Sequence, residues 1–315
     1  MIVRLGAMGD IVHTLPAAAS LRKSFPDAEL SWVVAPKWMP LLVGNPAIDR
    51  IVLFERKGAP ALLRSWNALR EVRPDIAVDF QGLLQSALVA RASRPKMLFG
   101  WSREAAREPV AALLYTKKLT PNAAHIVDRN LELAAAAGAQ CITHEVWIPE
   151  GRAEGQLPEQ PFVLAHPFAG WVSKQWPIER YDDLGRHLER DGIAVVANVP
   201  MNRADELRSL QHIHVHTSSL EGLIHATRHA AAVLGLDSGP LHLAAALGKP
   251  GVALFGPTDP ARNGPYGASI RVLRDAAART TYKRGDSVDS SMAALTVDQV
   301  YESLREALKV AKPLA

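Results

Sequence analysis

The sequence lacks the features of several protein classes. Cys141 is the single cysteine among 315 residues, which excludes an internal disulfide framework and a zinc site built from several cysteines. No stretch offers the roughly 18 consecutive apolar residues that a membrane-spanning helix needs. The segment Met1–Leu5 has no charged region followed by an apolar one, as a signal peptide would. We therefore expect a cytoplasmic protein.

The length and the charge distribution suggest two unlike halves. A chain of 315 residues is about twice a common domain length of roughly 150, and this predicts two domains. Residues 1–150 hold 18 basic and 14 acidic side chains, whereas residues 151–315 hold 18 of each. Within the first half, residues 50–118 hold 13 basic and 6 acidic side chains. This excess predicts either a surface that attracts an anionic partner or an ordinary solvated one.

Short apolar runs alternate with helical stretches in both halves. The predicted strands are Ile2–Leu5, Leu30–Ala35, Arg50–Phe54, Ile76–Asp79, Lys96–Gly100, Phe162–Ala165, Ile193–Asn198, Ile213–Val215, Ala232–Leu236 and Val252–Phe255. The predicted helices include Ile11–Ser24, Ala61–Val72, Leu83–Arg91, Ala123–Ala137, Arg180–Arg190 and Leu220–Arg228. This alternation predicts an α/β fold of parallel sheets. The polar segment 149–161, rich in glycine and proline, is the predicted linker.

The first predicted strand leads into Leu5-Gly6-Ala7-Met8-Gly9-Asp10. Two glycines permit a tight turn from strand to helix, which places Asp10 in the first turn of the helix. The helix dipole favours an ionised carboxylate there, and such a group can act as a general base. A helix-capping role for Asp10 fits the same spacing. Because a full G-x-G-x-x-G fingerprint is missing, a nicotinamide dehydrogenase is disfavoured.

The second half contains a denser motif, Asp237-Ser238-Gly239-Pro240-Leu241-His242. A buried strand again meets a helix, and the free amides at Ser238 and Gly239 would suit a diphosphate. Asp237 or Ser238 could instead cap the helix, and His242 could face the core. Three further residues, Thr258, Lys174 and Glu206, follow strands of this half. Lys174 could neutralise a phosphate. For Glu206, a position on a solvated helix face is the competing interpretation.

Two motifs together resemble those of the bacterial lipopolysaccharide heptosyltransferase family, glycosyltransferase family 9. They are Gly6–Pro16 and Asp237–His242, the latter with Phe255-Gly256-Pro257-Thr258. Further similar segments are Gln81–Ala87, Trp101, Ala106–Pro109 and His125–Arg129. The resemblance spans nearly the whole chain. It implies a GT-B fold, in which two Rossmann-like domains face across a cleft, with residues 1–150 binding the acceptor and residues 160–315 the nucleotide sugar.

The same resemblance implies a reaction. L-glycero-D-manno-heptose would move, with inversion, from ADP-heptose to a Kdo hydroxyl of lipid A at the cytoplasmic face of the inner membrane, where the enzyme would be peripheral. Asp10 would accept the hydroxyl proton, without a metal or cofactor, and no nucleic-acid partner is expected. The implied donor residues are Lys174, Asp237, Ser238, Gly239, His242, Thr258 and Glu206. The implied acceptor residues are Gly9, His13, Arg64, Arg107 and Arg129.

Three alternatives stay open at this point. A nucleotide-sugar 2-epimerase would share the fold, but it needs no anionic acceptor and leaves the basic excess of residues 50–118 unexplained. A heptosyltransferase acting on a later core sugar is the second. A two-domain ligand-binding protein of the periplasmic kind is disfavoured by Met1–Leu5 and by Asp10 at a helix start. A metallohydrolase is also disfavoured, because Asp237 and His242 lack partners at zinc-ligand spacing.

Overall fold

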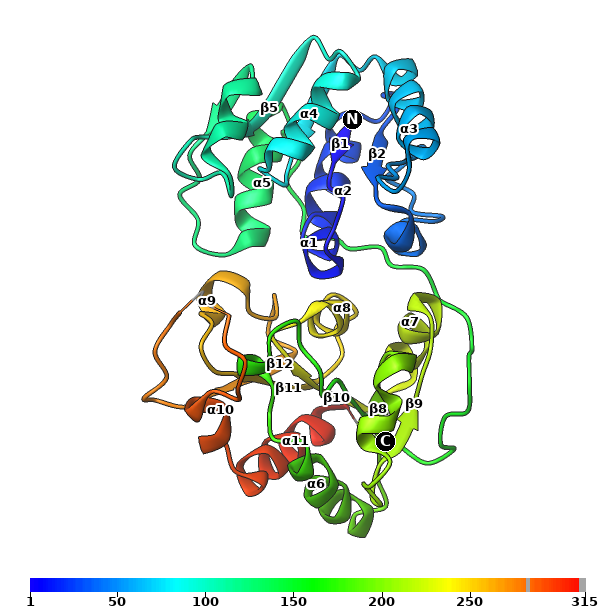
Figure 1. Cartoon of the computed structure of the whole chain (residues 1–315), viewed down its shortest axis with the longest axis vertical. Coiled ribbons are helices and arrows are strands. Elements are labelled where there is room, and N and C mark those ends of the chain that lie inside the picture. The colour runs from blue at the N-terminus through cyan, green and yellow to red at the C-terminus, as the bar shows by residue number, and fades with distance from the viewer. Residues whose placement is uncertain (282–283, 312–315) are drawn as a thin grey trace. The chain divides into compact units, whose positions relative to one another are not determined.

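The structure is a computed structural model that describes residues 1–281 and 284–311. The chain divides into two compact units, Met1–Pro149 and Glu150–Ala315 (Figure 1). We call them unit 1 and unit 2.

Unit 1 is built on a parallel sheet. In the described residues the sheet has six strands in the order β3-β2-β1-β4-β5-β6, and every neighbouring pair is parallel. The strands are β1 (Ile2–Val3), β2 (Ser31–Val34), β3 (Arg50–Leu53), β4 (Ile76–Asp79), β5 (Met97–Trp101) and β6 (Lys117–Leu119). This order is that of the Rossmann fold, whose ligands bind at the carboxyl ends of the strands.

Helices cover the sheet of unit 1. They are α1 (Met8–Val12), α2 (Leu15–Ser24), α3 (Ala59–Val72), α4 (Leu84–Ala92) and α5 (Ile126–Ala136), with 3-10 helices η1 (Pro36–Leu41) and η2 (Pro109–Leu114). The prediction of a single helix over Ile11–Ser24 is wrong in one respect, because the helix is interrupted between α1 and α2. Pro16 near the start of α2 has no N–H to donate to the carbonyl of Val12. The carbonyl of His13 accepts a hydrogen bond from the side-chain amide of Asn130 at 2.9 Å.

Unit 2 repeats the same strand order. Its six described strands run β12-β11-β10-β7-β8-β9, all parallel. They are β7 (Phe162–Ala165), β8 (Ala194–Asn198), β9 (His214–His216), β10 (Ala232–Leu236), β11 (Gly251–Phe255) and β12 (Ile270–Arg274). Strand β7 is central beside β10, as β1 is beside β4 in unit 1, so the two units have the same topology.

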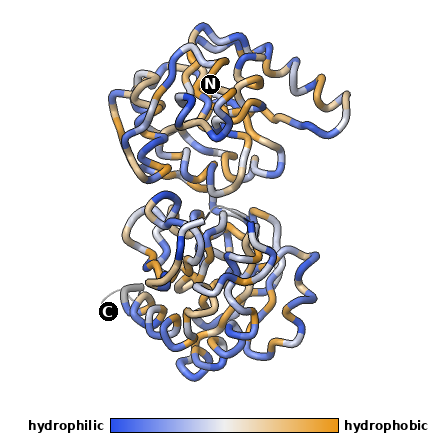
Figure 2. Tube along the Cα trace, turned by 60° about the vertical axis from the view of Figure 1, so that its left-hand side comes forward, coloured by the Kyte–Doolittle hydropathy of each residue, from blue (hydrophilic) through white to orange (hydrophobic). Residues whose placement is uncertain are grey.

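The helices of unit 2 include a long carboxyl-terminal one that packs on the sheet. They are α6 (Glu179–Arg190), α7 (Leu220–His229), α8 (Gly239–Ala246), α9 (Pro260–Asn263), α10 (Ser290–Ala294) and α11 (Val297–Ala311), with 3-10 helices η3 (Val172–Lys174) and η4 (Met201–Leu207). Helix α11 contacts β10, β11, β12 and α6. In Figure 2 the tube of many helices changes repeatedly between blue and orange, as expected of helices with one apolar face.

All of the predicted linker except Pro149 belongs to unit 2. Segment 149–161 has no helix or strand, but the boundary between the units falls at its beginning, between Pro149 and Glu150. The carboxylate of Glu154 accepts hydrogen bonds from the backbone N–H and the hydroxyl of Ser219, both at 2.7 Å. Arg152 donates its backbone N–H to the carbonyl of Glu221. These contacts fix the segment on the start of α7.

Each unit has its own core. The strands β1, β2, β7, β10 and β11 are buried along their whole length, which is typical of parallel strands covered on both faces. No helix among residues 1–281 and 284–311 is long and apolar enough to cross a membrane.

Candidate active site

Asp10 lies in the first turn of α1, directly after the turn that leaves β1. Its carboxylate accepts a hydrogen bond from the backbone N–H of Ala7 at 3.3 Å. Glycine is needed in the preceding turn, because a Cβ on Gly6 would lie 2.6 Å from the indole nitrogen of Trp38. The predicted position of Asp10 is therefore confirmed, and the carboxylate also contributes to capping the helix.

Two arginines bind the Asp10 carboxylate. The guanidinium of Arg4, whose side chain is 1% exposed, lies 2.7 Å from Oδ1 of Asp10. Arg107 reaches both carboxylate oxygens with Nη2, at 2.9 and 3.0 Å, and its side chain is 47% exposed. Burial raises the pKa of Asp10, but the positive charges of Arg4 and Arg107 outweigh it, and the pKa lies below its ordinary value. Asp10 is therefore an ionised carboxylate with a buried positive partner, Arg4, and an exposed one, Arg107.

Arg4 is a site residue that the sequence did not reveal. It follows the short strand β1, is fully buried, and also donates a hydrogen bond to the carbonyl of Phe80 after β4. A buried arginine without an acidic partner would be very costly. The one available signal was a charged residue inside the otherwise apolar run Ile2–Leu5.

Asp79, at the end of β4, organises the neighbouring turn. Its buried carboxylate accepts hydrogen bonds from the hydroxyls of Ser86 and Tyr115, both at 2.7 Å. It also accepts from the backbone N–H of Gln81 at 2.9 Å and of Gly82 at 3.4 Å. Burial raises the pKa of Asp79 above its ordinary value, although these hydrogen bonds oppose the rise. The carboxyl group thus fixes the turn that follows β4.

The turn after β4 connects Asp79 to the site. Several hydrogen bonds tie the turn to its neighbours. Arg4 donates to the Phe80 carbonyl, the Leu5 N–H donates to Gln81 Oε1 at 2.8 Å, and the Glu108 N–H donates to the Gly82 carbonyl at 3.0 Å. Gly82 has a φ of +71°, and a Cβ there would lie 2.8 Å from Trp101. Arg4 thus contacts this turn directly, and Arg107 immediately precedes Glu108, which bonds to it.

The structure places the other predicted acceptor residues differently. Gly9 and His13 lie within and just after α1, both buried, and the His13 ring packs edge-on against His125 at 5.7 Å between centroids. Arg129 on α5 donates from Nε to the carbonyl of Ala123 at 2.9 Å. Arg64 on α3 is 73% exposed and lies 3.9 Å from Glu55. The structure brings Arg107 to Asp10, while these contacts of Arg64 and Arg129 are with other groups.

In unit 2, the motif that begins at Asp237 forms a compact cluster. Nζ of Lys174 lies 2.5 Å from Oδ2 of Asp237, and both side chains are largely buried. Nε2 of His242 lies 3.8 Å from the other carboxylate oxygen. Lys174 also lies over the ring of Trp171, 4.3 Å from its centroid. Three of the predicted donor residues, Lys174, Asp237 and His242, therefore lie close together.

Helix α8 begins at Gly239, with Ser238 as its N-cap and Pro240 near its start. The first backbone N–H groups of a helix lack partners within the helix and attract anions. In the described part of the chain, Oγ of Ser238 and Oγ1 of Thr258 are buried and have no hydrogen-bond partner. They follow β10 and β11, two adjacent strands, so a lysine, two hydroxyls and a helix start lie at one edge of the sheet.

Glu206 is engaged elsewhere in this structure. Its carboxylate accepts two hydrogen bonds from Arg203, at 2.6 and 2.7 Å. The guanidinium of Arg203 in turn lies over the Phe168 ring, 3.4 Å from its centroid. Among residues 1–281 and 284–311, no group of three or more histidine, cysteine or acidic side chains is arranged to hold a metal ion.

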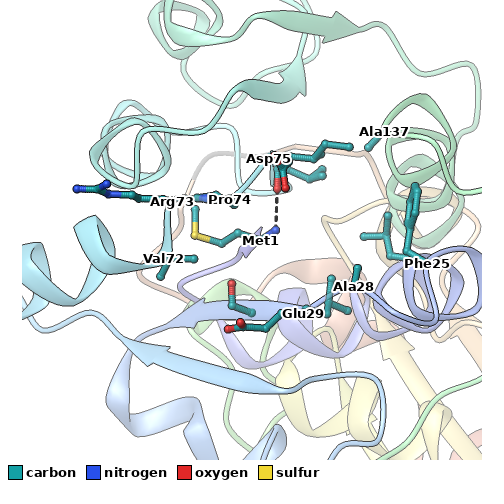
Figure 3. A pocket seen from close by; sticks show the side chains of 14 residues that line it. Met1, Phe25, Ala28, Glu29, Val72, Arg73, Pro74, Asp75 and Ala137 are labelled. Carbon is teal, nitrogen blue, oxygen red and sulfur yellow. Dashed lines mark hydrogen bonds between the residues drawn. The ribbon is translucent and has the colours of Figure 1, made fainter.

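A cavity of about 410 Å³ lies at the opposite edge of the unit 1 sheet (Figure 3). It is lined at the amino ends of β1, β2 and β4 by Met1, Ser31 and Ile76, together with Phe25 and Asp75. None of the predicted site residues lines it. Because ligands of doubly wound sheets bind at the carboxyl ends of the strands, this cavity is separate from the site around Asp10.

Two doubly wound units with polar clusters at the carboxyl ends of their strands have the architecture of a GT-B enzyme. Solved structures agree. "E. coli heptosyltransferase WaaC with ADP" is 26% identical, with a TM-score of 0.77, and the match covers 97% of this chain and 98% of that one. "E. coli ADP-heptose lps heptosyltransferase II" has a TM-score of 0.81 over 98% of each chain, and at 22% identity it supports the fold alone. The predicted fold class is confirmed.

The chain belongs to glycosyltransferase family 9 (heptosyltransferase), whose model matches residues 62–291. Lipopolysaccharide heptosyltransferase 1 of Pseudomonas aeruginosa is 29% identical over 293 residues, which cover 85% of this chain and 81% of the relative. The protein is therefore a glycosyltransferase, and the resemblance seen in the sequence is confirmed.

Proposed function

We propose that this glycosyltransferase moves L-glycero-D-manno-heptose from ADP-heptose to a Kdo hydroxyl of the lipid A inner core, with inversion at the anomeric carbon. The observation that carries the proposal is the ionised Asp10 carboxylate between Arg4 and Arg107. The relatives' names support the choice of sugar and pathway, and the ADP in the solved E. coli structure supports the donor. In this proposal unit 1 binds the acceptor and unit 2 the donor.

The proposed chemistry is a single displacement. The acceptor oxygen forms a bond to the anomeric carbon while its proton passes to Asp10. The bond between that carbon and the diphosphate oxygen breaks, and ADP leaves with the bonding electrons. Lys174 and the first N–H groups of α8 stabilise the charge that develops on ADP. No step of this scheme uses a metal or a cofactor.

Because Arg107 pairs with Asp10, binding of the acceptor can also change the basicity of Asp10. A carboxylate held by two arginines is a weak base, because both positive charges favour its ionised form. Arg107 is half exposed and presents a planar donor group that suits the carboxylate of Kdo. When Arg107 turns to the acceptor anion, Asp10 loses one positive neighbour and becomes a stronger base. Binding of the acceptor thereby activates the group that deprotonates it.

The other predicted contacts complete the proposal. His13, Gly9, Arg129 and Arg64 are proposed acceptor contacts, and the basic excess of residues 50–118 attracts the anionic head group. The proposed donor contacts are Asp237, Ser238, His242, Thr258 and Glu206, the last after its release from Arg203.

We further propose that the enzyme works at the cytoplasmic face of the inner membrane as a peripheral protein. Membership of a glycosyltransferase family argues against the epimerase alternative.

The proposed reaction is tested by incubating the protein with ADP-heptose and Kdo-lipid A. We expect release of ADP together with a mass increase of one heptose in the lipid. ADP-glucose serves as the donor control and is expected to react much more slowly. A second acceptor that already carries the first heptose tests the alternative of a later core sugar. Extension of that acceptor alone would contradict the proposal.

Replacing Arg107 with alanine should weaken acceptor use selectively. Loss of charge-assisted hydrogen bonds worth roughly 1.5–3 kcal/mol predicts an increase of about 10- to 150-fold in the Michaelis constant for the acceptor. The constant for ADP-heptose should change little. Because removing a positive charge raises the pKa of Asp10, the acid limb of kcat/KM should move to higher pH. Steady-state kinetics across pH measure both effects.

Arg103 provides the matched control, since it is an exposed arginine four residues earlier in the same basic segment. Arg103→Ala should leave both Michaelis constants and the pH profile near those of the original protein. Equal effects of the two substitutions would mean that general surface charge, and not Arg107 itself, holds the acceptor.

A further inference from the structure

Three adjacent elements of unit 1 expose large apolar side chains to solvent. Helix α3 packs against α4, and α4 packs against η2. The exposed side chains are Leu62 and Leu63 on α3, Leu84 and Leu88 on α4, and Val110 and Leu113 on η2. Leu63 is 61% exposed and Leu113 is 77% exposed. Contiguous apolar surface of this kind marks an interaction site. We call these six side chains the leucine face.

The spacing of these residues directs them to common sides of their elements. Leu84 and Leu88 are four residues apart on α4, and therefore lie one turn above the other. Leu62 has the same relation to Trp66 on α3. Val110 and Leu113 are three residues apart in a 3-10 helix, which has three residues per turn. Helix α4 and η2 thus each present a short apolar stripe, and on α3 Leu63 lies beside the stripe of Leu62 and Trp66.

A shallow groove joins two of the stripes. It has a volume of about 480 Å³ and is lined by Phe54, Trp66, Leu84, Leu88 and Val89, together with Gln85 and Glu108. Trp66 comes from α3, and Leu88 and Val89 come from α4. The groove therefore connects Trp66 on α3 with Leu84 and Leu88 of the leucine face on α4.

Basic side chains accompany the leucine face. Those of Arg56, Lys57, Arg64, Arg70 and Arg91 belong to the same helices or to the segment before α3, and all are exposed. The nearby acidic groups are largely engaged. Glu55 lies 3.9 Å from Arg64, and Glu108 accepts a hydrogen bond from the backbone N–H of Leu84 at 2.7 Å. The surface thus combines exposed apolar stripes with a positive surround.

We infer that the leucine face docks unit 1 onto an anionic phospholipid surface. A bilayer offers apolar chains beneath negatively charged head groups, and this matches apolar stripes with basic neighbours. Neither Arg4, Asp10 nor Arg107 belongs to the face, so docking leaves the site around Asp10 unchanged. The inference rests on the proposed function in one respect, namely that the acceptor is lipid-linked. It adds to that proposal the surface and the class of lipid.

Vesicle binding of the full-length protein tests this inference. Wild-type protein should sediment with vesicles of phosphatidylethanolamine and phosphatidylglycerol, bind neutral phosphatidylcholine vesicles more weakly, and be released by salt. The double substitution Leu63→Glu/Leu113→Glu should lower the binding constant for the anionic vesicles by at least about tenfold, because two apolar contacts are lost and two negative charges gained. The control Met201→Glu/Val215→Glu changes exposed apolar residues of unit 2, 76% and 42% exposed, and should bind like wild type.

Two further measurements keep the outcomes distinct. Turnover with a deacylated, water-soluble Kdo acceptor should be the same for wild type and Leu63→Glu/Leu113→Glu, which shows that the variant is folded. Vesicle binding without any heptose transfer would refute the proposed function and leave the docking surface standing. Equal loss in both double variants, or no binding by wild type, would overturn the inference. A wild-type dimer that the Leu63→Glu/Leu113→Glu variant disperses, without vesicle binding, would identify the face as a contact between copies and overturn it too.

Discussion

Asp10→Asn should reduce turnover by roughly 100- to 10,000-fold while leaving ADP binding nearly unchanged. Asparagine keeps an oxygen that can accept the hydrogen bond from the Ala7 N–H, so the capping contact of α1 survives. What disappears is the ability to accept a proton and the negative charge between Arg4 and Arg107. The loss therefore reports on proton transfer and not on helix formation. Single-turnover rates with saturating ADP-heptose, together with calorimetric titration of ADP, measure it.

The control for this substitution is Asp128→Asn. Asp128 also lies in the first turn of a helix of unit 1, α5, and its carboxylate is 40% exposed beside His144 at 3.8 Å. We expect its replacement to change turnover by less than about twofold, because exposed pairs contribute little. A fall of less than tenfold for Asp10→Asn would favour the capping role over the role of general base.

Arg4→Met should destabilise the protein more than Arg107→Met, because Arg4 is the buried partner of Asp10 and Arg107 is the exposed one. Breaking a buried ion pair by removing one partner costs about 3–5 kcal/mol, since the remaining charge stays desolvated. Arg107→Met removes the exposed partner of the same carboxylate and should cost at most about 1 kcal/mol. Urea unfolding of the two variants, followed by circular dichroism, gives the comparison. Equal losses would mean that the burial of Arg4 has no energetic consequence.

The sign of the pH dependence follows from the pKa of Asp10. In the folded protein this pKa is lowered from its ordinary value of 3.8. The stabilisation is therefore fully present above that value and is lost as the pH falls through the folded-state pKa. The difference in unfolding free energy between wild type and Arg4→Met should accordingly be largest at neutral pH. It should shrink in acid, where protonation of Asp10 leaves the buried Arg4 of wild type unpaired.

The central strands of both sheets were predictable from sequence. Ile76–Asp79, Phe162–Ala165 and Ala232–Leu236 form strands with the predicted bounds, because buried parallel strands read as short apolar runs. The edge strands β6 and β12 were not predicted. Lys117-Lys118-Leu119 and Ile270–Arg274 carry charged side chains that an edge strand can expose to water, so their composition resembles that of a loop.

The site was predictable where its residues occur in local motifs. Asp10, Lys174 and the start of α8 follow strands, and topology places the ends of parallel strands at one sheet edge. The pairing of Arg107 with Asp10 joins residues 97 positions apart, and no local pattern encodes it. The same holds for Asp79, whose partner Tyr115 is 36 residues away. Glu206 was predicted from its position after β8, but its pairing with Arg203 depends on side-chain geometry within η4.

The packing of segment 150–161 on α7 determines where the chain can be divided for expression in pieces. A fragment that begins at Glu150 retains the carboxylate of Glu154, which covers the N–H and hydroxyl of Ser219 at the start of α7. A fragment that begins at residue 160 loses this group. It also exposes the surface of α7 against which Gly151 packs, so closely that a Cβ on Gly151 would lie 2.4 Å from the carbonyl oxygen of Glu221. Recombinant unit 2 should therefore start ten residues before the predicted domain border.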